Sequence, residues 1–255
     1  MRWQFYRQTL VVEARKLRRS PVARIATASV LTLVGVTTVG GYAAAMHGAE
    51  TDMGQKAAAL VGTPGWPGYT GLAATSIGIT MLLAVGITMA WLAGREFTDG
   101  TIVGLFALPP SLGTIGTAKL VTSLTWMALV SVAAALVTTM GGIVLGLPAS
   151  GAAGHAATIL LVGVLLGGGA VPSMWVATRW RGYLPGIAAT LALVIVTNVA
   201  AGFGLGTYIP WAVPVLWATP GTHTPGAMLA LPMAVAAVSA WAVHHAWRTV
   251  QLGAS

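Results

Sequence analysis

Six long apolar runs, separated by short polar or glycine- and proline-containing segments, dominate the chain. Each run is close to or longer than the roughly 20 residues that an α-helix needs to cross a hydrocarbon core of about 30 Å. The apolar residues are continuous and do not alternate with polar ones, which favours helices over the strands of a membrane barrel. The pattern predicts six membrane-spanning helices, at residues 25–46, 70–94, 119–146, 155–177, 183–206 and 226–247.

Two further segments differ from these spans. Residues 1–19 are interrupted by charges, but an apolar residue recurs at every third or fourth position. On a helix this spacing forms one apolar stripe, which consists of Trp3, Tyr6, Leu10, Ala14 and Leu17. This amphipathic pattern predicts a helix lying in the membrane surface. Residues 207–225 are apolar but too short and too rich in proline to span, so we expect a segment that re-enters the membrane from outside before the sixth span.

Composition places the whole chain in one class. Of its 255 residues 56% are hydrophobic and 7% are charged, whereas a soluble globular domain carries about 25% charged residues. We therefore predict an all-α integral membrane protein with a single transmembrane domain over residues 1–255. The chain has no cysteine, which excludes disulfides and thiolate metal sites.

The basic residues give an orientation. Of the 13 lysines and arginines, all but Lys56 fall on one side of the predicted spans. The positive-inside rule then predicts a multi-pass protein of the plasma membrane with both termini in the cytoplasm. This bias accounts for the net charge of +8 without a nucleic-acid partner.

The segment between the second and third spans is the most polar island in the chain. It contains Glu96 and Asp99, two of the five acidic residues. We expect Thr98 or Asp99 to cap a helix that begins near Gly100. Its apolar face has no lipid to bury it, so a cleft in a protein partner is the natural place for it, although an ordinary loop lying on the membrane would show the same composition.

This island resembles the loop between spans two and three of ABC-2-type permeases, the membrane subunits of ATP-binding-cassette exporters. The resemblance rests on Glu96, Gly100-Thr101, Leu105, Leu108-Pro109, Ser111 and Lys119, and on an N-terminal segment with Glu13, Lys16, Leu17 and Arg19. The chain departs from the family at Leu112, where many members carry a basic residue.

The resemblance implies roles for these segments. Residues 97–111 would form a coupling helix on the cytoplasmic side, and residues 1–19 a connecting helix. Contact with the partner would involve Glu96, Phe97, Asp99, Gly100, Thr101, Leu105, Phe106, Leu108, Pro109 and Ser111. The expected partners are two copies of an ABC ATPase, a second permease chain of the same or a similar sequence, and the lipid bilayer. ATP and Mg²⁺ would bind the ATPase, and this chain would hold no cofactor.

Other functions remain open. The chain has no P-loop motif, and no acidic residue lies deep in a predicted span, which weakens a secondary carrier or channel without excluding it. A membrane-embedded enzyme would need a polar cluster, for which the candidates are His244, His245 and Arg248. We find no catalytic constellation and no metal-ligand pattern. The expected cargo is an amphipathic or lipophilic molecule such as a drug, an antimicrobial peptide or a lipid.

Polar residues within the fifth span are candidates for a substrate path. Thr190 and Thr197 are seven residues apart and share a helix face, and Asn198 is the single asparagine in the chain. The alternative for Asn198 is a hydrogen bond between helices. Glycine pairs such as Gly163 with Gly167 and Gly202 with Gly206 predict close helix packing.

Overall fold

A computed structural model describes residues 2–48 and 50–251, and within these ranges the chain is helical and contains no strand. Residues 1, 49 and 252–255 lie outside the description, as do the side chains of residues 2 and 3, and so the predicted place of Trp3 in the N-terminal stripe. The α-helices are α1 (Arg2–Arg19), α2 (Pro21–Gly35), α3 (Gly41–His47), α4 (Asp52–Val61), α5 (Trp66–Thr98), α6 (Ile102–Phe106), α7 (Leu112–Val144), α8 (Ala152–Gly169), α9 (Val171–Arg179), α10 (Tyr183–Gly202), α11 (Val213–Ala218) and α12 (Ala230–Arg248).

Short segments of other helix types continue or join these elements. A π-helical segment, Val36–Gly40, joins α2 to α3, and 3₁₀ turns precede α8 and α12. Six stretches of the described chain are long and apolar enough to cross a membrane, which confirms the predicted number: Pro21–His47, Trp66–Thr98, Leu112–Val144, Ala149–Arg179, Tyr183–Gly202 and Gly226–Arg248.

The third span begins two turns earlier than the predicted residue 119. Ser111 has an extended backbone, and its Oγ accepts a hydrogen bond of 3.2 Å from the backbone N–H of Thr114. This is the N-cap arrangement that satisfies a free amide at a helix start. The cap starts α7 at Leu112, so Lys119 lies two turns inside the helix and not at its edge.

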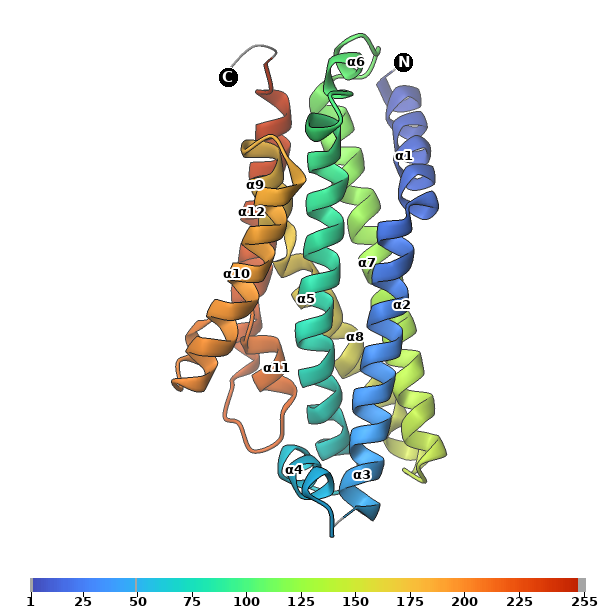
Figure 1. The fold of residues 1–255 in the computed structure, drawn as a ribbon, viewed down its shortest axis with the longest axis vertical. Coiled ribbons are helices and arrows are strands. Elements are labelled where there is room, and N and C mark those ends of the chain that lie inside the picture. The colour runs from blue at the N-terminus through green and yellow to red at the C-terminus, as the bar shows by residue number, and fades with distance from the viewer. Residues whose placement is uncertain (1, 49, 252–255) are drawn as a thin grey trace.

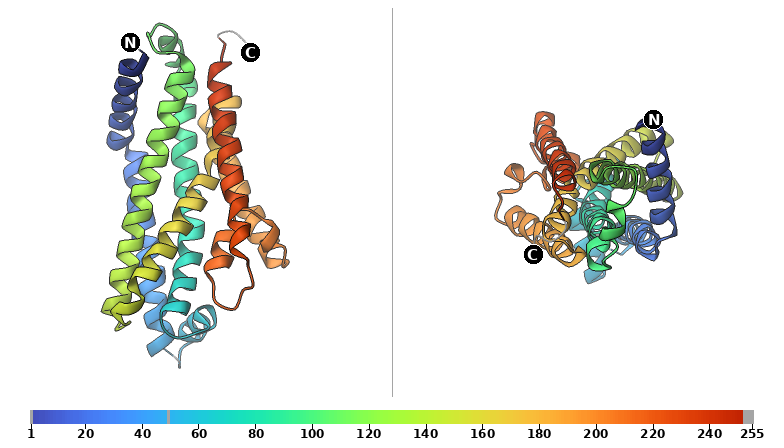
Figure 2. Two further views of the ribbon diagram at one scale, coloured as in Figure 1. Left: turned by 180° about the vertical axis from the view of Figure 1, so that it is seen from behind. Right: turned by 90° about the horizontal axis from the view of Figure 1, so that it is seen from above.

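Helix α5 is the centre of the bundle. It packs against α2, α7, α8, α9 and α10, and its membrane-spanning stretch is the most buried of the six. Helices α9, α10 and α12 stand on one side of it, and α1, α2 and α7 on the other (Figure 1). The start of α1, the end of α12 and helix α6 lie together at one end of the bundle, and we name this the terminal end (Figures 1 and 2). Helices α3 and α4 lie at the opposite end, which we name the far end.

Side chains of three helices lock the far end. His155 of α8 is buried and hydrogen-bonds through its two ring nitrogens with the hydroxyls of Thr70, at 2.9 Å, and Thr138, at 3.0 Å. The Tyr69 hydroxyl donates to the carbonyl of Thr138 at 2.7 Å. These contacts fasten α5, α7 and α8 together, so the far end is a packed support for the rest of the bundle.

The membrane contacts of two predicted elements, the N-terminal helix and the segment 207–225, stay predictions. Helix α1 runs beside the first turns of α7, roughly along the bundle axis (Figure 2), and its placement in a membrane surface stays a prediction. Helix α11, within the predicted re-entrant segment 207–225, packs against α5 and α8. Its entry into the membrane is likewise untested.

Candidate functional site

The face of α1 that packs against the bundle differs from the predicted stripe. Thr9, Glu13 and Leu17 are buried, whereas Ala14 is exposed. The buried stripe therefore has a carboxylate at its centre. Leu17 belongs to both the predicted stripe and the buried face, but apolar spacing cannot identify Glu13, because a charged residue is buried only when a partner of opposite charge meets it.

Lys119 of α7 is that partner. Its side chain is fully buried, and its Nζ donates hydrogen bonds to Glu13 Oε2 at 2.8 Å and to Glu96 Oε1 at 2.9 Å. Glu13 and Glu96 come from α1 and from the last turn of α5. One ammonium group thus joins three helices at the terminal end of the bundle.

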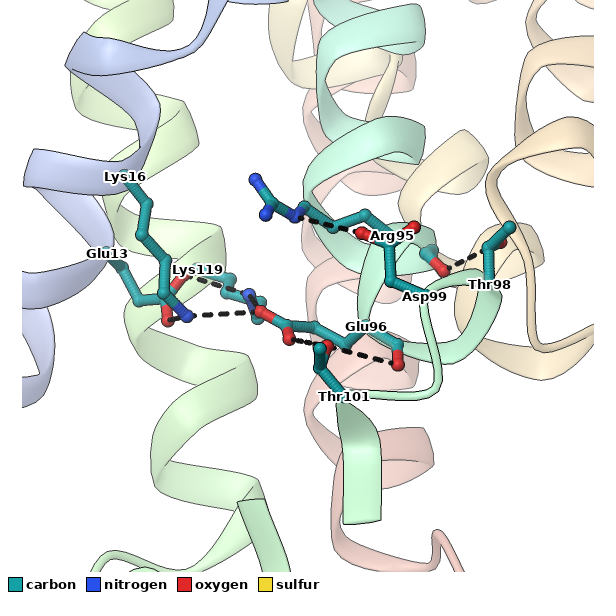
Figure 3. Close-up of polar contacts among 9 residues, drawn as sticks. Glu13, Lys16, Arg95, Glu96, Thr98, Asp99, Thr101 and Lys119 are labelled. Carbon is teal, nitrogen blue, oxygen red and sulfur yellow. Dashed lines mark hydrogen bonds and ion pairs between the residues drawn. The ribbon is translucent and has the colours of Figure 1, made fainter. Parts of the chain in front are cut away.

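Glu96 extends this connection to the loop. Its Oε1 also accepts a hydrogen bond from Lys16 Nζ at 3.1 Å, and its Oε2 accepts one from Thr101 Oγ1 at 2.7 Å. Thr101 immediately precedes α6. Figure 3 shows these side chains converging from α1, α5, α7 and the loop.

We name Glu13, Lys16, Glu96 and Lys119 the charge cluster. Lys16 completes it by donating to Glu13 Oε1 at 2.9 Å, so two carboxylates face two ammonium groups and the formal charges cancel. Balance of this kind is what allows ions to be buried, because an unpaired buried charge costs several kcal/mol. The ring of Trp247, from α12, lies 5.9 Å from Lys119 Nζ and covers the cluster on that side.

Lys16 is the solvent-facing member of the cluster, with 33% of its side chain exposed. Burial by itself lowers the pKa of its ammonium group, but the carboxylates of Glu13 and then Glu96 outweigh burial and raise the pKa above the ordinary 10.5. Lys16 therefore stays protonated at neutral pH and holds its two ion pairs.

This raised pKa predicts a pH dependence of stability. The folded chain binds the Lys16 proton more tightly than the unfolded chain, so the contribution of Lys16 is complete below pH 10.5 and is lost as the pH rises through the higher folded pKa. We expect the stability difference between the wild type and Lys16→Met to be constant from about pH 7 to about pH 9 and to shrink above about pH 11. Equilibrium unfolding in detergent measures it, and a difference that declines already near neutral pH would contradict the prediction.

The loop after α5 does not follow the predicted capping. Helix α5 continues through Thr98, whose hydroxyl donates back to the carbonyl of Gly94, and Asp99 ends the helix and lies 3.9 Å from Arg95. Neither residue caps α6. Gly100 has a φ of 69°, a left-handed conformation that costs glycine little, and this residue turns the chain from α5 into α6.

Helix α6 presents apolar side chains outward. None of its five residues is buried, and Val103 and Phe106 are 60% and 40% exposed; Leu108, two residues after the helix, is 50% exposed. A pocket of about 200 Å³ lies between α1 and the segment that contains α6. Its lining is mostly apolar and includes Phe5, Val12, Leu105, Leu108, Pro109 and Pro110, with Glu13 and Lys16 of the charge cluster.

The predicted partner-contacting residues thus divide into two groups. Glu96 is buried in the charge cluster, and Phe97 packs inward, with its ring 5.8 Å from that of Trp247. The outward group includes Asp99, Gly100, Thr101, Phe106, Leu108, Pro109 and Ser111. On α1, Arg19 is exposed and takes no part in the cluster.

The candidate substrate-path residues lie in two places. Thr190 is buried and its hydroxyl donates to Ser173 Oγ of α9 at 2.8 Å. Thr197 and Asn198 line a pocket of about 110 Å³ between α5, α10 and α11. The Asn198 amide donates to the carbonyl of Val194 in its own helix, so it makes no hydrogen bond between helices.

The residues of the enzyme alternative do not converge. His244 Nδ1 lies 2.8 Å from the hydroxyl of Thr117, whereas the ring of His245 stacks on Trp241. Within residues 2–48 and 50–251, no three histidine, aspartate or glutamate side chains lie together as metal ligands would.

The sequence analysis took Lys119 only as the start of the third span and missed its role as the buried ion-pair partner of two glutamates. The available signal was a lysine without an acidic neighbour in the sequence, two turns inside an apolar helix. Such a residue in a membrane protein calls for a buried carboxylate.

Comparison with known proteins gives one match. Residues 9–197 match the model of a family described as ABC-2 family transporter protein. The matched region begins in α1, includes the whole charge cluster and α6, and ends within α10. No curated protein matches the chain.

Proposed function

Because the chain belongs to the ABC-2 family of transporter proteins, we propose that it is the permease subunit of an ATP-driven exporter and that a separate ATPase docks on its terminal end. The chain is a membrane transport component and not itself an enzyme. ATP and Mg²⁺ are then bound by the ATPase, since the sequence has no P-loop.

The observation that carries the docking proposal is the exposed apolar surface of α6 beside the pocket under α1. Val103, Phe106 and Leu108 lie outside the six spans and are exposed, so neither the bundle nor the hydrocarbon core buries them. A contiguous exposed apolar patch favours a protein partner. The adjacent pocket of about 200 Å³ would accept an apolar side chain of that partner.

The charge cluster supports a route by which movement at α6 reaches the spans. Thr101 precedes α6 and donates to Glu96, which shares the ammonium of Lys119 with Glu13. Displacement of α6 would therefore pull on α1, α5 and α7 together. Closure of the ATPases on ATP would bias the permease between inward-facing and outward-facing states in this way.

The remaining parts of the proposal rest on charge and family. The bias of the basic residues supports a cytoplasmic location for the terminal end, in a protein of the plasma membrane. Two permease chains, identical or similar, would pair around a path and dock two ATPases. The pocket that contains Thr197 and Asn198 is lined mainly by apolar side chains, which suits an amphipathic or lipophilic cargo such as a drug, an antimicrobial peptide or a lipid.

Substitution on α6 tests the docking surface. We expect Phe106→Asp combined with Leu108→Asp to lower the amount of ATPase that co-purifies with the tagged chain by about tenfold or more, because each change removes buried apolar contact worth about 1.5–3 kcal/mol. The measurement is the molar ratio of the P-loop subunit to this chain after mild detergent extraction from the native host.

The matched control is Leu60→Asp on α4. Leu60 is also exposed, at 67%, but lies at the far end. Equal loss of the ATPase in both variants, or none in the α6 variant, would contradict docking on α6.

A further inference from the structure

A groove of about 370 Å³ runs along the contact between α2 and α5, in the half of the bundle nearer the terminal end. Its lining consists of Val22, Ile25, Ala26, Ser29, Val30, Leu33, Thr80, Leu83, Ala84 and Ile87. Eight of these ten residues are apolar, and the hydroxyl of Thr80 donates to the carbonyl of Ser76 in its own helix. The groove walls are therefore suited to hydrocarbon.

The groove has the length of one acyl chain in one leaflet. From Val22 to Leu33 the lining of α2 extends about 16 Å, at the helical rise of 1.5 Å per residue. This is about half of a hydrocarbon core of about 30 Å. A chain lying in the groove would thus reach from the membrane surface to about the midplane.

Trp91 and Arg95 continue the α5 lining toward the terminal end. They follow Ile87 at steps of four residues, so all three share one face of the helix. Trp91 packs against the cluster that contains Leu17 and Ala23, where α1 meets α2. Along this helix face Trp91 therefore lies between the groove residues and Arg95.

The Arg95 side chain is positioned by Trp91, but its hydrogen-bonding capacity is only partly satisfied within the chain. Its guanidinium carbon lies 4.6 Å from the centre of the Trp91 ring, and its Nε is buried without a hydrogen-bond partner. The carboxylate of Asp99 is 3.9 Å from that Nε, and the Asp99 side chain is half exposed, so this ion pair is weak. Figure 3 shows the Arg95 side chain extending from α5 toward the α1 side.

Further basic residues lie at the start of α2 and along α1, which precedes it. Four exposed arginines lie along α1 and at its junction with α2, and none forms an ion pair within the described chain: Arg15, Arg18, Arg19 and Arg24. Guanidinium groups bind phosphate through charge-assisted hydrogen bonds. A guanidinium on the same helix face as a leaflet-length apolar groove complements an anionic phospholipid.

We propose that the groove binds one acyl chain of an anionic phospholipid and that Arg95 binds the phosphate of its headgroup. A helix of a second copy is a poorer occupant because it has no suitable carboxylate for Arg95. Glu13 and Glu96 are buried in the charge cluster, Glu50 and Asp52 belong to the far end, and Asp99 already lies beside Arg95 in its own copy. The site does not depend on the docked ATPase.

Photo-crosslinking in lipid nanodiscs tests the site. The full chain is reconstituted with phosphatidylglycerol that carries a diazirine in one acyl chain, and labelled peptides are mapped by mass spectrometry. We expect the label on residues 22–33 and 80–87, and a decrease of about fivefold in Arg95→Gln, which corresponds to one lost cationic contact with an anionic lipid. Phosphatidylcholine with the same chain should label these peptides equally weakly in both proteins.

The control variant is Arg179→Gln. Arg179 also stacks on a tryptophan at the terminal end, with its guanidinium carbon 6.0 Å from the Trp180 ring, but it adjoins no groove residue, so labelling should be unchanged. Ala84→Trp fills the groove and should abolish labelling, whereas Ala192→Trp on the exposed face of α10 should not. Equal labelling by phosphatidylcholine, no effect of Arg95→Gln, or crosslinks to a second copy of the chain in place of lipid would each overturn the proposal.

Discussion

Replacement of Lys119 by methionine is expected to lower the free energy of unfolding by about 3–5 kcal/mol, the usual cost of removing one partner from a buried ion pair. Lys119 is fully buried and holds Glu13 and Glu96 at 2.8 and 2.9 Å. Without it, two buried carboxylates share the ammonium of Lys16, which is one-third exposed. Equilibrium unfolding in mixed detergent micelles, followed by circular dichroism, gives the magnitude.

Two comparisons isolate the buried charge as the cause. Lys16→Met should cost less, about 1 kcal/mol, because Lys16 is one-third exposed and Lys119 still pairs with both carboxylates after its removal. The triple variant Glu13→Gln, Glu96→Gln and Lys119→Met should recover much of the loss of Lys119→Met, because it leaves no unpaired buried carboxylate. If Lys119→Met cost no more than Lys16→Met, the cluster would not be the buried junction of α1, α5 and α7.

Addition of a single methyl group at Gly94 is expected to destabilise the chain by about 2–3 kcal/mol, the upper part of the range for overpacking. A Cβ built on Gly94 would lie 2.3 Å from the backbone N of Tyr183 and 2.5 Å from the carbonyl carbon of Gly182. These are backbone atoms of the turn that starts α10, and they cannot move aside as a side chain can. Gly94→Ala should therefore force α10 away from α5, the helix against which it packs most extensively.

Gly154→Ala provides the matched control for this prediction. Gly154 is in α8, and nothing lies within 4 Å of a Cβ built there. Because alanine favours helix more than glycine does, this change should be neutral or stabilising by up to about 1 kcal/mol. The same unfolding assay measures both variants, and equal stability of Gly94→Ala and Gly154→Ala would show that α5 and α10 are less closely packed than in the structure.

The glycines show which part of helix packing a sequence motif can predict. Both members of the predicted pair Gly163 and Gly167 meet α7, at Ser131 and at Met127. Gly202 has open space around it, although it belongs to an equally spaced pair. Gly94 is in no pair that the sequence analysis selected. Spacing alone identifies a helix surface that permits close approach, but only the arrangement of the neighbouring helices decides which glycine is used.

The sequence by itself determined the number of spans. Length and hydropathy are local properties, and the bilayer requires a helix wherever about 20 apolar residues follow one another. Gly100 permits the left-handed turn at the end of α5 for an equally local reason. The resemblance to ABC-2-type permeases selected Glu13, Lys16 and Glu96 as residues of interest.

Only the tertiary structure decided that these residues meet Lys119. Glu13 and Lys119 are 106 positions apart, and Glu96 and Lys119 are 23 apart. A charged residue faces water when it is alone and faces the interior when its counter-ion is there, so its direction depends on a residue far away in the chain. Apolar periodicity therefore could not identify Glu13 as a buried residue of α1, and only the packing of α1 on α7 decided which side chains of this helix face the bundle.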